Sequence, residues 1–279
     1  MKTIAHPTRR SSHERAFTLF ELFVVAGVIL LLAITLFPAV AKSNAPPKSF
    51  QCLNNHRQLM NAWRMYSHDF NDKLAAALIM PDRPLWVTGI MDYNRGNPSN
   101  WNTNQDIVKS PLWPYTPKNA SIFRCPADEA SVVVNQVRRP RVRSYSLSSV
   151  FGDGQFLGSS FAAPWRLYTK GAEIVIPAHT FTFVDEHADS INDCEIYSAC
   201  SGNQPQDPPG SARLIDWPAS WHNGGCTFSF ADGRSENHQW VTSRMKQLLR
   251  YDGEAPKNLI LPGAYVDLHW LAANTTVHQ

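Results

Sequence analysis

The chain has 279 residues, of which 43% are hydrophobic and 18% are charged. This composition fits a folded protein with one large domain and short appendages, and it excludes a chain that is disordered throughout. The formal net charge is +3, and it arises wholly in residues 1–16, from Lys2, Arg9, Arg10 and Arg15 against Glu14. The rest of the chain is formally neutral, so nucleic acid is not an expected partner.

Five cysteines occur without a C-x-x-C pair, which argues against zinc ribbons and thioredoxin-like redox sites. If the domain is exported, one or two disulfides can form and at least one thiol stays free. The sequence does not fix the pairing of these residues, which are Cys52, Cys125, Cys194, Cys200 and Cys226.

An uncharged apolar run extends from Leu22 to Ala41. A helix of about 20 residues reaches roughly 30 Å, the thickness of the hydrocarbon core of a bilayer. The alternative is a buried core helix of a soluble protein, but such a helix normally keeps a polar stripe. We therefore expect a transmembrane helix, with the basic segment before it held in the cytoplasm.

Two processing routes fit this N-terminal region. One is an ordinary cleavable signal peptide, with Ala39-Val40-Ala41 as the small-x-small cleavage site. The other is a cut between Ala16 and Phe17, which leaves the apolar helix on the mature protein. Glu21 favours the second route, because a carboxylate at the start of a membrane segment costs on the order of 2–3 kcal/mol and is seldom kept without a use.

The segment Ala16-Phe17-Thr18-Leu19-Phe20-Glu21-Leu22 resembles the processing motif of type IV prepilins. The resemblance implies that a membrane peptidase cuts before Phe17 and methylates its new amine, which makes Glu21 the fifth residue of the mature chain. It also implies a leader peptide over 1–16 and a transmembrane or filament helix over 17–44. Ala16 stands where the family usually has Gly, and Phe20 stands where Ile is common.

In an assembling filament, the N-terminal amine of an incoming subunit lies in apolar surroundings and needs a counter-charge. Glu21 of a neighbouring subunit would supply it, and such a pair is stronger in low dielectric than in water. The expected partners are therefore a prepilin peptidase, other pilin-like subunits and the membrane.

Beyond the apolar run, Pro46 and Pro47 should interrupt the helix. Apolar residues then recur at three- and four-residue spacing up to Phe70, which predicts an amphipathic stalk helix over 45–70. The segment Gln51–Leu59 resembles the continuation found in a large subgroup of prepilin-like proteins, and Ile122–Asp128 resembles a second signature of that subgroup. Residues 71–279 are expected to form an exported α+β domain.

A buried strand is predicted at Thr180–Val184, which delivers Asp185-Glu186-His187 at its end. In the segment from His222 to Gly233, alternating apolar residues follow a Gly-Gly turn, and Asp232-Gly233 fits the tight turn of a hairpin. The same segment resembles the H-X9-DG signature of a C-terminal domain associated with prepilin processing.

Three site hypotheses remain open beside a purely structural role. An oxygen-rich cluster fits the ligand chemistry of calcium, although its spacing is not that of an EF-hand; it comprises Asp185, Glu186, Asp189, Asn192 and Asp193. A tethered metal-dependent hydrolase would use His222, Asp232, His187 and Asp185, but no recognisable catalytic motif surrounds them. Exposed tryptophans such as Trp217 would instead allow polysaccharide binding.

The expected fold is α+β and pilin-like: a long N-terminal hydrophobic helix, then an antiparallel-sheet globular domain. The expected function is that of a membrane-anchored prepilin-like structural protein of a type II secretion or type IV pilus-like system. We expect no enzymatic activity and no cofactor, with calcium as the one candidate ion. The expected location is the bacterial inner membrane, single-pass, with the bulk periplasmic or extracellular.

Overall fold

The computed structural model describes residues 18–43, 47–158, 164–253 and 255–279. The chain divides into two compact units, Met1–Pro46 and Pro47–Gln279. The first unit contains helix α1, and the second contains the remaining helices and every strand described.

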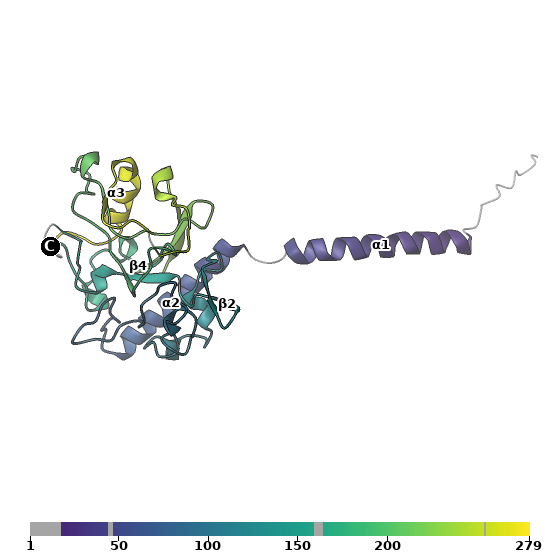
Figure 1. Cartoon of the computed structure of the whole chain (residues 1–279), viewed down its shortest axis with the longest axis horizontal. Coiled ribbons are helices and arrows are strands. Elements are labelled where there is room, and N and C mark those ends of the chain that lie inside the picture. Colours follow the sequence, from purple (N-terminus) through teal and green to yellow (C-terminus); the bar gives the residue numbers. More distant parts are fainter. Residues whose placement is uncertain (1–17, 44–46, 159–163, 254) are drawn as a thin grey trace, which may run out of the picture. The chain divides into compact units, whose positions relative to one another are not determined.

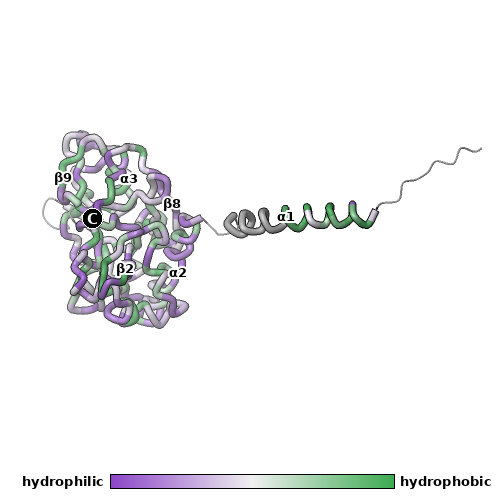
Figure 2. Tube along the Cα trace, turned by 45° about the vertical axis from the view of Figure 1, so that its right-hand side comes forward, coloured by the Kyte–Doolittle hydropathy of each residue, from purple (hydrophilic) through white to green (hydrophobic). Residues whose placement is uncertain are grey.

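Helix α1 spans Leu19–Ser43, and its side chains are described as far as Leu32. Its described turns are strongly apolar (Figure 2). Apolar side chains at successive positions are exposed, including Leu19 at 72% and Phe20 at 77%. Among the described residues of the first unit, therefore, nothing covers these side chains.

The prediction of a membrane-spanning segment is contradicted. No helix within the described part of the chain is long and apolar enough to cross a bilayer. The predicted transmembrane helix over 17–44 is therefore wrong, as are the long N-terminal hydrophobic helix of the predicted fold class and the single-pass inner-membrane location.

Helix α2 spans Lys48–Asp69 and begins directly after Pro47. Pro47 has φ −51° and ψ 143°, the extended conformation that a proline can place before a helix. The predicted amphipathic pattern is confirmed, because one face of the helix is buried in the second unit. The buried residues are Cys52, His56, Leu59, Met60, Ala62, Trp63, Tyr66 and Ser67.

A five-stranded sheet forms the centre of the second unit, with the order β5-β3-β4-β7-β8. Neighbouring strands are antiparallel except β3 and β5, which are parallel. The predicted antiparallel sheet is thus mixed at one edge. The strands are β3 (Tyr145–Ser148), β4 (Phe181–Asp185), β5 (Glu195–Ile196), β7 (Gly225–Phe230) and β8 (Ser235–Gln239).

Two small sheets and a third helix complete the α+β unit. The antiparallel pairs are β1 (Ser131–Val134) with β2 (Val137–Pro140), and β6 (Arg213–Leu214) with β9 (Leu259–Ile260). Helix α3 spans Tyr265–Ala273. Short 3-10 turns connect the elements at Pro98–Asn100, Trp113–Tyr115, Ala120–Phe123, Ser149–Phe151, Gly171–Glu173, Pro177–His179, Pro209–Ser211, Ser243–Met245 and Pro262–Ala264.

The sheet lies between α2 and α3, and Figure 1 shows these helices on either side of β4. On the α2 side, the rings of Trp63 and Phe183 meet edge to face with centroids 6.5 Å apart. On the α3 side, Phe228 and Trp270 do the same at 5.1 Å. Strand side chains alternate between the two faces, so the single sheet separates two hydrophobic cores.

Candidate functional site

The predicted processing residues Ala16 and Phe17 lie outside the described residues, whereas Glu21 lies in the first turn of α1. Its carboxylate accepts hydrogen bonds from the Thr18 backbone N–H at 2.9 Å and from the Thr18 hydroxyl at 2.8 Å. The Glu21 N–H donates to the Thr18 hydroxyl at 3.3 Å. These reciprocal bonds form a capping box.

The capping box gives Glu21 a local structural role that the sequence argument did not consider. The backbone and hydroxyl hydrogen bonds from Thr18 lower the pKa of Glu21, because both stabilise the carboxylate. A carboxylate also suits the positive end of the helix dipole. Glu21 is therefore an anion at neutral pH that fixes the start of α1.

The His222–Asp232–Gly233 motif folds as predicted, with β7 and β8 forming an antiparallel hairpin. Gly233 has φ +98°, a conformation that glycine adopts without strain. The Asp232 side chain accepts a hydrogen bond from the Arg234 N–H at 3.0 Å, which fixes the turn. Asp232 thus stabilises the hairpin turn that follows β7. His222 lies before the start of β7, at the opposite end of the strand.

Replacing Gly233 by alanine should lower the free energy of unfolding by about 1 kcal/mol or more, because alanine is strained at positive φ. The matched control is Gly210→Ala, since a side chain at Gly210 would meet nothing within 4 Å. Urea unfolding of the two variants measures the difference. Equal stability of G233A and G210A would contradict the role assigned to the turn.

His222 also belongs to a set of polar side chains buried between α2 and the sheet. At its centre is Asp185, the last residue of β4, which has no solvent exposure. Its two carboxylate oxygens lie 3.3 Å from His56 Nε2 and 3.3 Å from His222 Nε2, respectively. The Thr227 backbone N–H also donates to this carboxylate, at 3.2 Å.

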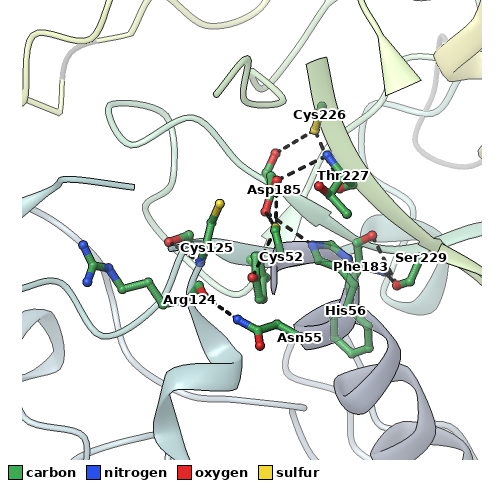
Figure 3. A network of polar contacts seen from close by, with 12 residues as sticks. Cys52, Asn55, His56, Arg124, Cys125, Phe183, Asp185, Cys226, Thr227 and Ser229 are labelled. Carbon is green, nitrogen blue, oxygen red and sulfur yellow. Dashed lines mark hydrogen bonds and ion pairs between the residues drawn. The ribbon is translucent and has the colours of Figure 1, made fainter. Parts of the chain in front are cut away.

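Two thiols complete the set. Cys52 Sγ lies 3.2 and 3.3 Å from the two oxygens of Asp185, and Cys125 Sγ lies 3.3 Å from His222 Nε2. Figure 3 shows Cys52 and His56 on α2 directed towards the Asp185 carboxylate. One potential ligand atom from each of four residues lies within 4.8 Å of the other three. We call these four residues the buried cluster: Cys52, Cys125, Asp185 and His222.

Local structure explains why these side chains meet. Cys52 and His56 are four residues apart on α2 and therefore share its buried face. Cys125 follows the 3-10 turn Ala120–Phe123, where the Asn55 amide of α2 donates to the Arg124 carbonyl at 3.0 Å. Asp185 and His222 meet because β4 lies beside β7 in the sheet.

The electrostatics of the set favour charged groups despite their burial. Burial would raise the pKa of Asp185, but hydrogen bonds from His222 and His56 lower it well below its usual value. Burial would lower the pKa of His56, yet its contacts with Asp185 and Cys52 raise it to about 9. The pKa of His222 is raised to about 10 by the same two groups against the opposing effect of burial. The ionised Asp185 therefore organises both imidazoles.

The five residues of the predicted calcium cluster do not meet at one point, unlike the residues of the buried cluster. Asp185 faces α2, whereas Glu186 accepts hydrogen bonds from Ser146 and Ser190. Adjacent residues on a strand point to opposite faces. The other three cap separate backbone or side-chain groups: Asp189 accepts from Arg250 N, Asn192 from Lys257 Nζ, and Asp193 from Glu195 N.

The fold also separates the residues of the other two site hypotheses. Of the four hydrolase candidates, the buried cluster holds Asp185 and His222. His187 Nδ1 instead accepts from the Asp189 N–H at 3.2 Å, and Asp232 lies in the hairpin turn. Trp217 is fully buried, and its indole N–H donates a hydrogen bond to the Pro256 carbonyl. It therefore offers no ring face to a sugar.

Cys52, His56 and Cys125 were not predicted as site residues. Cys52 and His56 lie in the segment Gln51–Leu59, Cys125 lies in Ile122–Asp128, and His222 lies in the H-X9-DG segment, and all three segments resemble those of prepilin-like proteins. A cysteine or histidine in each of these three segments was the available signal. All five cysteines are buried free thiols in this structure.

Comparison with protein-family models, with curated proteins and with solved structures gives no match to this chain. The geometry of α1 and of the buried cluster is therefore the basis for assigning a function.

Proposed function

We propose that the chain is a prepilin-like structural subunit that assembles with other pilin-like subunits through α1. In this proposal a prepilin peptidase cuts between Ala16 and Phe17, and the chain itself catalyses no reaction. The observation that carries the proposal is the uncovered apolar surface of α1 together with the ionised Glu21 in its first turn.

The apolar surface of α1 is continuous around the helix. Leu22 is 60% exposed and Phe23 is 70% exposed, directly after the exposed Leu19 and Phe20. Val24 and Val25 are also exposed, at 50% and 45%, and with them the exposed apolar positions between residues 19 and 25 cover every side of a helix with 3.6 residues per turn. A helix that is apolar on all sides is normally buried, and an exposed apolar surface of this kind marks an association site. Copies of the same helix provide a matching apolar surface.

The capping box adds a second argument. Thr18 is the cap residue, so α1 starts at Leu19, the third residue of the proposed processed chain. The new amine on Phe17 would carry a positive charge beside the positive end of the helix dipole, which is unfavourable. A carboxylate of a neighbouring subunit would offset this charge inside an apolar bundle. Glu21 is the acidic residue of the first turn that is available for this purpose.

The test of processing is co-expression with a prepilin peptidase, followed by mass spectrometry of the intact chain. The expected product begins at a methylated Phe17. The control is a catalytically inactive peptidase, with which the chain should keep residues 1–16. A mature N-terminus at Lys42, or an uncut chain with the active enzyme, would contradict the proposal.

Replacing Glu21 by glutamine should weaken assembly of the processed chain by about thirtyfold, because it removes one partner of the proposed charge pair between subunits. Cross-linking and sedimentation of the processed protein measure the assembled fraction.

Thr18→Ala is the matched control for this experiment. It removes the capping hydroxyl and leaves the Glu21 charge in place, so assembly should be retained. Assembly of E21Q at the wild-type level would show that Glu21 acts only as a capping residue.

A further inference from the structure

The four donor atoms of the buried cluster lie close to the spacing of a tetrahedral metal site. Zinc bonds of about 2.0–2.3 Å keep neighbouring ligand atoms roughly 3.3–3.8 Å apart. The contacts between Cys52 and Asp185, Asp185 and His222, and His222 and Cys125 are 3.2–3.3 Å, and all four atoms lie within 4.8 Å of one another. Small outward movements of the side chains would admit an ion at their centre.

The donor set selects the metal. Two thiolates with one imidazole and one carboxylate oxygen suit zinc, which binds sulfur, nitrogen and oxygen ligands with tetrahedral geometry. Magnesium and calcium prefer oxygen ligands alone. Zinc also compensates the charge of this buried position, because a dication balances most of the negative charge of two thiolates and a carboxylate.

The surroundings contain the outer contacts that metal ligands usually have. His56 Nε2 lies 3.3 Å from one oxygen of Asp185, and the Thr227 N–H donates to the other oxygen at 3.2 Å. The Tyr145 hydroxyl lies 3.4 Å from Cys52 Sγ. Such contacts hold ligands in orientation and raise metal affinity.

The cluster also lies beside a surface cavity. Cys125 contributes to the lining of a surface cavity of about 460 Å³, together with Asn55 of α2 and Arg124. The cluster residues themselves are buried, with Cys52, Cys125 and Asp185 at 0% exposure. A metal ion could reach the cluster past Cys125 and would then be enclosed, as structural sites are.

We propose that the buried cluster binds one structural zinc ion. The ion ties together four segments that are far apart in the sequence: α2, the turn at Cys125, the end of β4 and the start of β7. In this arrangement the H-X9-DG segment has two separate tasks. Its histidine is a zinc ligand, β7 fills most of the spacing, and Asp232-Gly233 turns the chain into β8.

Two other arrangements of the same residues are the rivals of this proposal. The side chains could form a metal-free hydrogen-bonded network around Asp185. Alternatively, Cys52 and Cys125 could join in a disulfide under oxidising conditions. The zinc proposal does not depend on the assembly role of α1, and its test does not involve Glu21.

The test is metal analysis of the purified full-length chain. Native mass spectrometry and elemental analysis should find about one zinc per chain. Replacement of zinc by cobalt(II) should produce the thiolate-to-cobalt charge-transfer band of a tetrahedral sulfur site. His222→Ala and Asp185→Asn should lose the metal, and His56→Gln, which alters an outer contact only, should bind it about 10–100-fold more weakly.

Cys200→Ser is the matched control, because Cys200 is an equally buried thiol outside the cluster. It should keep both the zinc and the cobalt spectrum. If ligand variants fail to fold, the cobalt titration of the wild-type chain still decides the question. A metal-free chain with five free thiols, or an intact mass that reports a Cys52–Cys125 disulfide, would overturn the proposal.

Discussion

Removal of zinc is expected to lower the thermal unfolding midpoint of the chain by roughly 8–16 °C. An ion present at about a thousand times its dissociation constant stabilises the folded state by about 4 kcal/mol. For a domain of about 150–250 residues, each kcal/mol moves the midpoint by about 2–4 °C. The loss should be this large because the buried cluster connects α2 to the sheet, and without the ion only hydrogen bonds join the polar side chains of the cluster within the hydrophobic core. Differential scanning calorimetry with and without a strong chelator measures this shift of the unfolding midpoint.

Asp185→Asn is the informative comparison for this measurement. It keeps the size of the side chain and removes the anionic ligand, so its midpoint should already be low and should not respond to the chelator. Cys200→Ser should respond as the wild-type chain does. A wild-type midpoint that is the same with and without the chelator would rule out a stabilising metal ion.

Local patterns in the sequence predicted the elements that surround the site. The three- and four-residue apolar spacing up to Phe70 corresponds to α2, the β-branched and aromatic run at Thr180–Val184 corresponds to β4, and Asp232-Gly233 makes the hairpin turn. Each of these signals lies within a few residues of chain, where backbone preference and burial act directly.

The buried cluster could not be predicted in the same way. Its ligands lie on four separate segments, and they meet only because β4 pairs with β7 while α2 packs across that pair. Strand pairing of this kind is set by tertiary packing rather than by local sequence. In the oxygen-rich segment from Asp185 to Asp193, residues that are close in sequence do not share a site. Neighbours in sequence alternate between the faces of a strand, so Asp185 and Glu186 point apart.

At the N-terminal segment, the structure adds a second role for a residue that the sequence had already indicated. Glu21 was interpreted through the resemblance to prepilins, as a counter-charge for another subunit. The structure adds the capping box with Thr18, which is a short-range role that the T-x-x-E spacing already contained. The two roles are compatible, because the carboxylate that caps the helix stays at the surface.

The stability of the second unit should fall as the pH rises from about 5 to about 8, in part because of Glu195. This carboxyl is 1% exposed. Burial raises its pKa to about 8, against the hydrogen bond from Tyr197 and with help from the charges of Asp193, Asp153 and Asp216. A carboxyl whose pKa is higher in the folded than in the unfolded chain stabilises the fold at low pH. That contribution is lost as the pH passes through the folded value, and it can reach about 4 kcal/mol.

Glu195→Gln should remove much of this dependence, because the amide keeps the shape of the neutral carboxyl and cannot ionise. Urea unfolding between pH 5 and pH 9 measures the slope for both proteins, and the variant should gain stability relative to the wild-type chain as the pH rises. Glu186, whose pKa burial also raises to about 8, should leave a residual slope in the variant. Glu129→Gln, at an exposed carboxylate on the surface, is the control and should keep the wild-type slope. Parallel pH profiles for E195Q and the wild-type chain would mean that Glu195 is already ionised at neutral pH, held by contacts stronger than the Tyr197 hydrogen bond.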